Sequence, residues 1–182
     1  MSTSLIADHC APRLRRLGLG GLSSLTDLDL EDVGRCHSLT WLDLCACSKL
    51  SDTGLKSIGR LAERQMKARA KWQSTAAAAT AEAPPVLVHL DLGGLGRLSD
   101  EGLHKLTVRM PHLHKLDLRG CGRLTEDGLA RALAGYTVAG VQVAPSLTMP
   151  ELQSLTVSSL PAASEAVISL IQQSRPRLTI VH

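Results

Sequence analysis

The stretch LDLCACSKLSDTGL, at residues 42–55, contains the pattern that decides the fold. Its alternating leucines place Leu42 and Leu44 on one side of a short strand, because successive side chains of a strand point to opposite faces. A serine and an acidic residue come next. This order is typical of a helix N-terminus, where the hydroxyl caps free N–H groups and the carboxylate favours the positive end of the helix dipole. The stretch therefore predicts a strand, a tight turn and a helix, followed by a return segment.

The same pattern recurs along the chain with a period of about 25 residues. In the first four copies, an L-x-x-L-x-L core is followed by an apolar residue or cysteine, a leucine, a serine or threonine, an acid and a further leucine. The cores begin at Leu14, Leu39, Leu87, Leu113 and Leu152. Because one such unit buries too little apolar surface to fold alone, the units are expected to stack. We interpret the chain as an α/β leucine-rich-repeat solenoid, a horseshoe fragment with a parallel sheet on the concave face and helices on the convex face.

The composition agrees with a folded, water-exposed chain of about one domain. Its 182 residues lie within the roughly 100–200 residues of a single domain. Hydrophobic residues make up 44% and charged residues 20%, which excludes global disorder, and the aromatic content of 2% leaves the core to aliphatic side chains. The formal net charge of +3 requires neither nucleic acid nor an acidic membrane as a partner. No run of about 18 apolar residues is present that could span a bilayer.

The motifs resemble the cysteine-containing leucine-rich repeats of the ribonuclease-inhibitor-like superfamily. The form L-D-L-x-x-C-x-x-L-[ST]-D-x-G-L at residues 42–55 is similar to repeats of F-box substrate receptors, and residues 116–129 match with one shift. The resemblance covers residues 14–58 and 87–133 well and 152–181 loosely. It implies the solenoid fold and a non-catalytic, protein-binding role of the adaptor or ubiquitin-ligase substrate-receptor type. Thirteen residues precede Leu14, too few for an F-box, so we expect any F-box function to come from another chain.

We expect residues 1–182 to form one repeat domain with two interruptions. The expected parts are an N-terminal cap at 1–13, repeats at 14–58, a helical extension with an Ala-rich flexible insertion at 59–86, repeats at 87–136, an irregular strand and loop at 137–151, and a last repeat with a C-terminal cap at 152–182. The strand in the irregular segment is expected at 137–143, where VAGVQV imitates the strand motif.

The first interruption predicts an extended helix over residues 53–72. Its inward positions are expected to be Leu55, Ile58, Ala62, Met66 and Ala70. Its basic residues are spaced three or four apart and therefore form one stripe, made of Lys56, Arg60, Arg64, Lys67 and Lys71. The stripe is either a solvated outer face or a docking helix for an acidic protein, RNA or an anionic membrane surface. The following residues 73–85, QSTAAAATAEAPP, predict a mobile linker.

The five cysteines lack the regular spacing of a disulfide framework, and free thiols suit a reducing compartment. Cys47 and Cys121 occupy the position that Leu22 and Leu95 fill in other repeats. We therefore interpret them as buried structural thiols, with metal binding and redox sensing as the alternatives. Cys45 is expected to be the most exposed thiol and hence the most reactive one.

Two features resemble parts of enzyme sites, and neither is complete. Cys45 and His89 are both expected on the inner sheet face, but this pair lacks a third group and an oxyanion donor. The glycines at 18–21 and 93–96 follow strands without forming a phosphate-binding motif. We therefore expect no catalytic residue, no metal and no cofactor.

The concave face is where we expect a partner to bind, because the third, fifth and seventh residues of each core point away from the hydrophobic core. These positions place a tryptophan beside carboxylates, a combination typical of a binding hot spot. The expected partner-binding residues are Trp41, Asp43, His89, Asp91, Lys115, Asp117 and Arg119. The alternative for the three aspartates, which form an acidic ladder on adjacent strands, is that they are merely solvated.

The sequence thus predicts a small adaptor in the cytoplasm, monomeric on its own, that binds another protein through its concave face. The nucleus and the mitochondrion are the alternative compartments. The alternative function is that of a structural subunit or assembly factor of a large ribosomal or respiratory complex, in which the basic helix 53–72 contacts RNA or an acidic partner.

Overall fold

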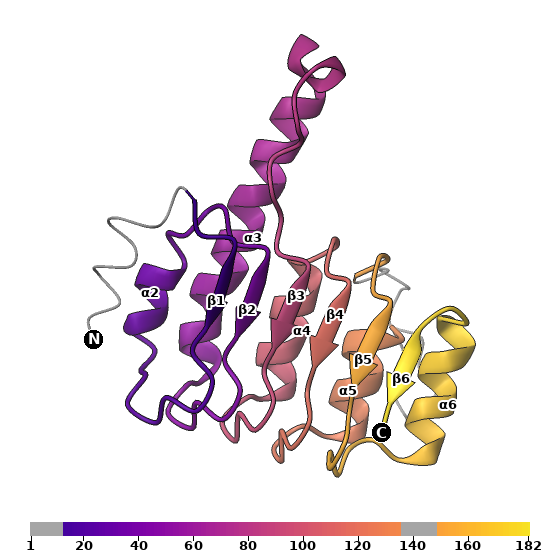
Figure 1. The fold of residues 1–182 in the computed structure, drawn as a ribbon. Helices are drawn as coiled ribbons and strands as arrows, with labels where there is room; N and C mark the ends of the chain where they lie inside the picture. The colour runs from indigo at the N-terminus through magenta and orange to yellow at the C-terminus, as the bar shows by residue number, and fades with distance from the viewer. Residues whose placement is uncertain (1–12, 136–148) are drawn as a thin grey trace.

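A computed structural model describes residues 13–135 and 149–182. Within these ranges the strands form one six-stranded parallel sheet whose spatial order follows the chain order. The strands are β1 (Arg16–Gly18), β2 (Trp41–Asp43), β3 (His89–Asp91), β4 (Lys115–Asp117), β5 (Ser154–Thr156) and β6 (Thr179–Val181). The helices are α2 (Asp29–Val33), α3 (Asp52–Gln73), α4 (Asp100–Val108), α5 (Glu126–Leu133) and α6 (Glu165–Ser174), with a short 3-10 helix η1 (Ala76–Ala79). Figure 1 shows the strands side by side along one face and the helices packed behind them.

The second leucine of each core sets the register of the sheet. Leu42 lies opposite both Leu17 and Leu90, and Leu116 lies opposite both Leu90 and Leu155. The side chains of Leu42 and Leu90 are fully buried. The stacking predicted from the repeat is therefore confirmed, and the fold is a leucine-rich-repeat solenoid.

Two parts of the expected organisation lie outside the described residues: the strand at 137–143, and the N-terminal cap except for its last residue. The last repeat, expected at 152–182, lies within the described residues and supplies β5, α6 and β6. Arg175, at the end of α6, joins it to the rest of the solenoid. Its guanidinium donates to the carbonyl oxygens of Leu133 (2.6 Å) and Met149 (2.7 Å).

Cysteines fill a core position that faces the preceding repeat. Cys47 and Cys121 are fully buried, as expected, and their thiols donate to the carbonyl oxygens of Leu19 (3.1 Å) and Leu92 (3.2 Å). Leu22 holds the same position in the first repeat but is 46% exposed, so the expected burial of this position is wrong there. Burial at this position depends on an earlier repeat, and none is present before the first one in the described part of the chain.

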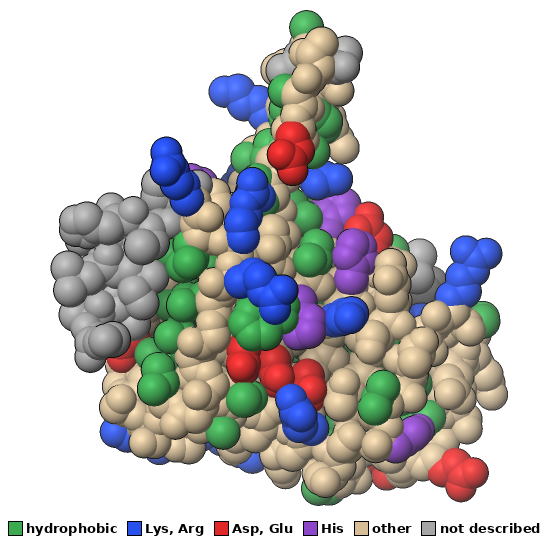
Figure 2. Space-filling model, viewed as in Figure 1, with side chains coloured by type: hydrophobic (Ala, Val, Ile, Leu, Met, Phe, Trp, Pro, Cys, Tyr) green, Lys and Arg blue, Asp and Glu red, His purple; other side chains and the backbone are tan. Residues whose placement is uncertain are grey.

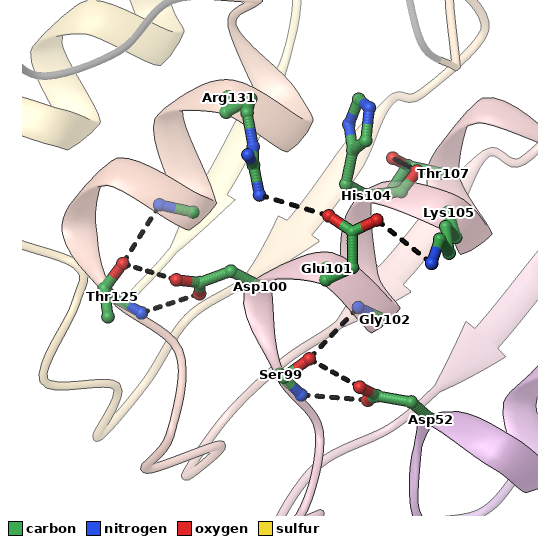
Figure 3. A network of polar contacts seen from close by, with 11 residues as sticks. Asp52, Ser99, Asp100, Glu101, Gly102, His104, Lys105, Thr107, Thr125 and Arg131 are labelled. Carbon is green, nitrogen blue, oxygen red and sulfur yellow. Dashed lines mark hydrogen bonds and ion pairs between the residues drawn. The ribbon is translucent and has the colours of Figure 1, made fainter.

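A carboxylate from each of the first three repeats holds the helix N-terminus of the next repeat, and Figure 3 shows the contacts of Asp52 and Asp100. Asp52 accepts hydrogen bonds from the Ser99 backbone N–H (2.9 Å) and hydroxyl (2.5 Å). The Ser99 hydroxyl in turn accepts from the N–H of Gly102 in the first turn of α4. The same contacts join Asp27 to Ser51 and Asp100 to Thr125. The acid that sequence analysis assigned only to its own helix dipole therefore also links neighbouring repeats.

The glycine three residues after each of these capping hydroxyls makes room for the incoming carboxylate. A methyl group at Gly102 would collide with the carboxylate of Asp52, and methyl groups at Gly54 and Gly128 would collide with the aspartates of the repeats before them. Glycine is required here because of a neighbouring repeat, not because of its own backbone conformation.

The first and last repeats carry other residues in this glycine position. In the first repeat Asp29 occupies it and accepts from the Thr26 N–H (2.8 Å) and hydroxyl (2.6 Å). The first repeat thus supplies this carboxylate from within itself, whereas each of the next three repeats receives it from the repeat before. In the last repeat the position holds Val167, whose N–H donates to the Ser164 hydroxyl (3.4 Å).

Helix α3 continues past the end of the sheet, and the following segment returns beside it (Figure 1). It extends one residue beyond the expected range at each end. Leu55, Ile58 and Ala62 are buried as expected, and Met66 is half-buried. Ala70 is exposed, so its expected inward position is wrong: it lies near the C-terminal end of α3, the part of the helix that projects beyond the sheet. Among the described helices, α3 included, none combines the length and the apolar character that crossing a membrane requires.

Gln65 fixes the base of this extension. Its side chain is 2% exposed, and its amide donates to the carbonyl oxygens of His37 (3.0 Å) and Leu39 (2.8 Å). Its carbonyl oxygen accepts from the N–H of Leu87 (2.9 Å), just before β3. One side chain therefore ties α3 to the segments that lead into two neighbouring strands. Sequence analysis missed it because a lone glutamine carries no periodic signal.

Replacing Gly102 with alanine is expected to lower the free energy of unfolding by about 1–3 kcal/mol, because the added methyl group must displace the Asp52 carboxylate that holds Ser99. Urea denaturation followed by circular dichroism measures the change. Gly96→Ala is the matched control, since nothing lies near the position of its added methyl group. Equal stability of the two variants would show that the Asp52 carboxylate can move aside without loss of stability, which would contradict the prediction.

Replacing Gln65 with alanine is expected to lower the free energy of unfolding by about 3 kcal/mol, because it leaves the buried backbone groups of Leu39 and Leu87, and the part-buried carbonyl of His37, without this partner. The same denaturation experiment applies. Gln172→Ala, at an exposed position of α6, is the control. A loss no larger than that of the control would contradict the role assigned to Gln65.

Candidate functional site

The expected partner-binding residues lie together on the exposed face of the sheet, in two rows across adjacent strands. The first row holds Trp41, His89 and Lys115, the first residues of β2 to β4, and continues to Arg16, the first residue of β1, which was not among the expected partner-binding residues. The second row holds Asp43, Asp91 and Asp117, the last residues of β2 to β4. Figure 2 shows a band of acidic side chains on this face with basic and histidine side chains next to it. The structure thus brings these residues together, while their binding of a partner stays a prediction.

The first row is built around two rings in tilted contact. The ring centroids of Trp41 and His89 are 5.5 Å apart with an interplanar angle of 31°. The guanidinium of Arg16 lies 4.8 Å from the centroid of the Trp41 ring, within the range of a cation–π interaction. Burial, followed by the positive charge of Lys115, lowers the pKa of His89 below its ordinary value. The two rings therefore form an uncharged, half-buried surface at neutral pH.

The second row has a structural duty that sequence analysis missed. In each aspartate one carboxylate oxygen accepts the backbone N–H two residues later and so closes the turn that follows the strand. These distances are 2.8 Å from Asp43 to Cys45, 2.9 Å from Asp91 to Gly93 and 2.9 Å from Asp117 to Arg119. The sequence did contain a signal for this role, because aspartate recurs at the ends of three strands although the residue two positions later differs each time.

Arg119 neutralises two members of the acidic row. Its guanidinium lies 2.9 Å from Asp91 and 3.1 Å from Asp117. The hydrogen bond to Asp91 and the charge of Asp117 raise the pKa of Arg119, while burial raises the pKa of Asp117. Arg119 was expected to contact a partner directly, and in the structure its charge is already paired within the sheet.

Cys45 is the least buried of the described cysteines, as expected, but not a reactive one. Burial, then its hydrogen bond to Asp43, raise the pKa of the Cys45 thiol to about 11, which contradicts the expected reactivity. Its sulfur and oxygens of Asp43 and Asp91 lie within 4.8 Å of one another, close enough to share a cation. However, the thiol is held protonated and both carboxylates already bind backbone N–H groups, so this group is poorly suited to bind a metal.

The pocket beside Cys45 does not form a Cys–His site. It is a shallow hollow of about 330 Å³ at the ends of the strands, and its lining includes Arg119, Gly94, Ser158 and Ser159. His89 is not among the lining residues. The geometry therefore does not bring the two candidate groups to one reaction site.

The basic residues of α3 are exposed, as the stripe predicts: Lys56, Arg60, Arg64, Lys67 and Lys71. Arg64 donates to the carbonyl oxygen of Gly34, so its charge is partly used within the fold. The other four have no hydrogen bond or ion pair to the described residues. They leave four unpaired cations on a helix whose far half projects from the solenoid.

No protein-family model matches the chain, and no curated protein matches it. Among solved structures, a chain of the crystal structure of the Rad7 and Elc1 complex in yeast is similar, with a TM-score of 0.55 and 17% identity over 89% of this chain. A chain of the crystal structure of the TLR13–ssRNA13 complex has a TM-score of 0.48 and 18% identity over 93% of this chain. The matches cover 31% and 19% of those chains, so this protein spans less than a third of either. At these identities the likeness concerns the fold alone.

Replacing Lys115 with methionine is expected to raise the pKa of His89 toward 6.5, because it removes the second-largest cause of the lowered value. NMR titration of the imidazole resonances measures it, with Lys49→Met as a control at an exposed turn. Since the folded-state pKa of His89 lies below its unfolded value, the stability it contributes is present above about pH 6.5 and is lost as the pH falls through the folded-state pKa. The Lys115→Met variant should retain a larger fraction of its stability at pH 5.5 than the unaltered protein does. An unchanged pKa of His89 in this variant would contradict the role assigned to Lys115.

Proposed function

We propose that the protein is a non-catalytic protein-interaction module that binds its partner through the concave sheet face, as an adaptor or substrate-recognition subunit. The observation that carries this proposal is the half-exposed Trp41–His89 ring pair, held on a rigid sheet between two cations, Arg16 and Lys115. Neither cation has an ion pair within the described residues. Exposed aromatic rings surrounded by polar groups are typical of the anchor positions of protein interfaces.

The proposed contact residues fall into two groups. The side chains of Trp41, His89 and Lys115 make no hydrogen bond or ion pair within the described residues, so we assign them the partner contacts. The remaining members are Asp43, Asp91, Asp117 and Arg119, whose polar atoms already serve the strand ends and one another. We propose that this second group positions the first and sets the charge beneath it.

A role in catalysis is not part of this proposal. The raised pKa of Cys45 works against a thiolate nucleophile, and the pocket next to it does not reach His89. We also propose that the repeats belong to the cysteine-containing, ribonuclease-inhibitor-like type, since buried thiols fill their core positions. Free cysteines support a reducing compartment: the cytoplasm, with the nucleus and the mitochondrion as alternatives.

A second candidate function is that of a structural subunit or assembly factor of a large complex. The observation that favours it is the projecting half of α3, which carries unpaired cations away from the solenoid. A helix of this kind can insert between neighbours or contact RNA phosphates, and such binding would weaken steeply with salt. In this case the concave face would be secondary.

Affinity capture with mass spectrometry separates the two functions. Trp41→Ala is expected to weaken capture of the partner at least tenfold, about 1.4 kcal/mol, because it removes the ring that anchors the face. A variant with residues 70–82 replaced by a four-residue Gly-Ser linker should retain capture. This replacement keeps Gln65 and the Arg69–Pro84 hydrogen bond (3.4 Å) at which the two legs of the extension meet.

Trp72→Phe serves as the matched control, since Trp72 is the other tryptophan of the chain and lies on the extension. Capture that survives Trp41→Ala and is lost with the linker replacement would reject the concave face. If the captured particle is then large and salt-sensitive, the assembly function takes its place.

A further inference from the structure

Four groups cross the concave face along one line, and their order has a chemical meaning. Arg16 on β1 and Lys115 on β4 lie at the ends, and the Trp41–His89 ring pair lies between them. Both cations are exposed and without an ion pair within the described ranges, whereas the rings are half-buried. The line therefore has the order cation, uncharged apolar surface, cation. The inference below about which ligand binds along this line rests on the proposed function.

The spacing of this line matches that of an extended peptide. Neighbouring strands lie about 4.8 Å apart, so Arg16 and Lys115, three strands apart, are separated by about 14 Å, and the middle of the ring pair is about 7 Å from each. In an extended chain, residues i, i+2 and i+4 point to the same side and are about 7 Å apart in turn. Three side chains of one extended segment can therefore meet the two cations and the rings together.

The charges decide which side chains those are. Stacking over Trp41 leaves the in-plane N–H donors of Arg16 available, and these suit the two oxygens of a carboxylate. Lys115 offers a second unpaired cation. The acidic row repels an acidic ligand only weakly at the Lys115 end, because Arg119 pairs with Asp91 and Asp117. Asp43 lies on the Trp41 strand, next to the place of the uncharged central residue.

We propose that the concave face binds an extended, acidic segment of a partner protein that crosses β1 to β4, with acidic residues at i and i+4 and an apolar residue at i+2. The acidic side chains bind Arg16 and Lys115, and the apolar side chain packs on the Trp41–His89 pair. The lowered pKa of His89 supports this central place for an uncharged group.

NMR titration with synthetic peptides tests the spacing. The chain has two tryptophans, so the indole N–H signal of Trp41 reports the site and that of Trp72 serves as an internal reference. The probe peptide GEGLGEG carries the proposed pattern, and GGLEEGG has the same composition with adjacent acidic residues. From the shift of the Trp41 signal, the probe peptide is expected to bind at least fivefold more tightly than the control peptide. The Trp72 signal should stay in place. Equal binding of both peptides would overturn the proposal.

Charge reversal tests the contacts. Lys115→Glu is expected to weaken binding of GEGLGEG at least tenfold, whereas Lys49→Glu, the same change at an exposed turn outside the face, leaves it unchanged. The peptide GEGLGKG should then bind Lys115→Glu more tightly than it binds the unaltered protein. This restored pairing cannot arise from a variant that has lost its fold. Equal loss in both lysine variants, or the absence of restored binding, would contradict the assignment.

Two further outcomes separate this inference from the function on which it rests. If a seven-nucleotide oligouridylate binds more tightly than GEGLGEG, as measured by the Trp41 signal, the ligand is a nucleic acid and the inference is wrong. If neither peptide binds but Trp41→Ala still abolishes partner capture, only the inference falls and the concave face remains the binding site. If capture is also insensitive to Trp41→Ala, the proposed function fails as well.

Discussion

No repeat of this chain can bury its flat sides alone, and every other feature of the structure follows from the stacking that this constraint imposes. Stacking places Leu17, Leu42, Leu90, Leu116 and Leu155 in one register across five strands. A fixed register fixes the distance between equivalent side chains at one strand spacing. The rows on the concave face therefore have defined geometry, and a ligand that crosses them meets groups at regular intervals of about 4.8 Å.

Aspartates stabilise this stack at two places, and in both the carboxylate accepts backbone N–H groups. On the sheet face each closes the turn after its own strand, and near the helix N-termini each holds the capping residue of the next repeat. These uses have a functional consequence. The carboxylates that look most available in the sequence are largely satisfied within the fold, whereas the rings and the two flanking cations of the first row are not. The chemistry left for a partner is thus aromatic and positive.

The insertion and the two ends show how a repeat pattern accommodates exceptions. Gln65 reconnects α3 to the segments that lead into β2 and β3, so a long extension can leave the solenoid without separating its strands. At the N-terminal end Asp29 supplies from within the first repeat the carboxylate that a preceding repeat would provide. Leu22, in contrast, keeps the residue type of a core position and loses its burial, since it has no earlier neighbour within the described part of the chain.

The sequence by itself determined the fold, the strand register, the extended helix and the residues that share the concave face, because all of these follow from periodicity. It could not determine which of those residues are already engaged. Arg119 pairs with aspartates of its own and the neighbouring strand, the Cys45 thiol is held protonated by burial and by Asp43, and Gln65 bonds to segments more than twenty residues away. The contacts of Arg119 with Asp91 and of Gln65 join different repeats, and Arg119, Cys45 and Gln65 do not recur at the equivalent positions of the other repeats. Their partners and burial exist only once the repeats are stacked, so the tertiary structure alone decided which groups are free to bind.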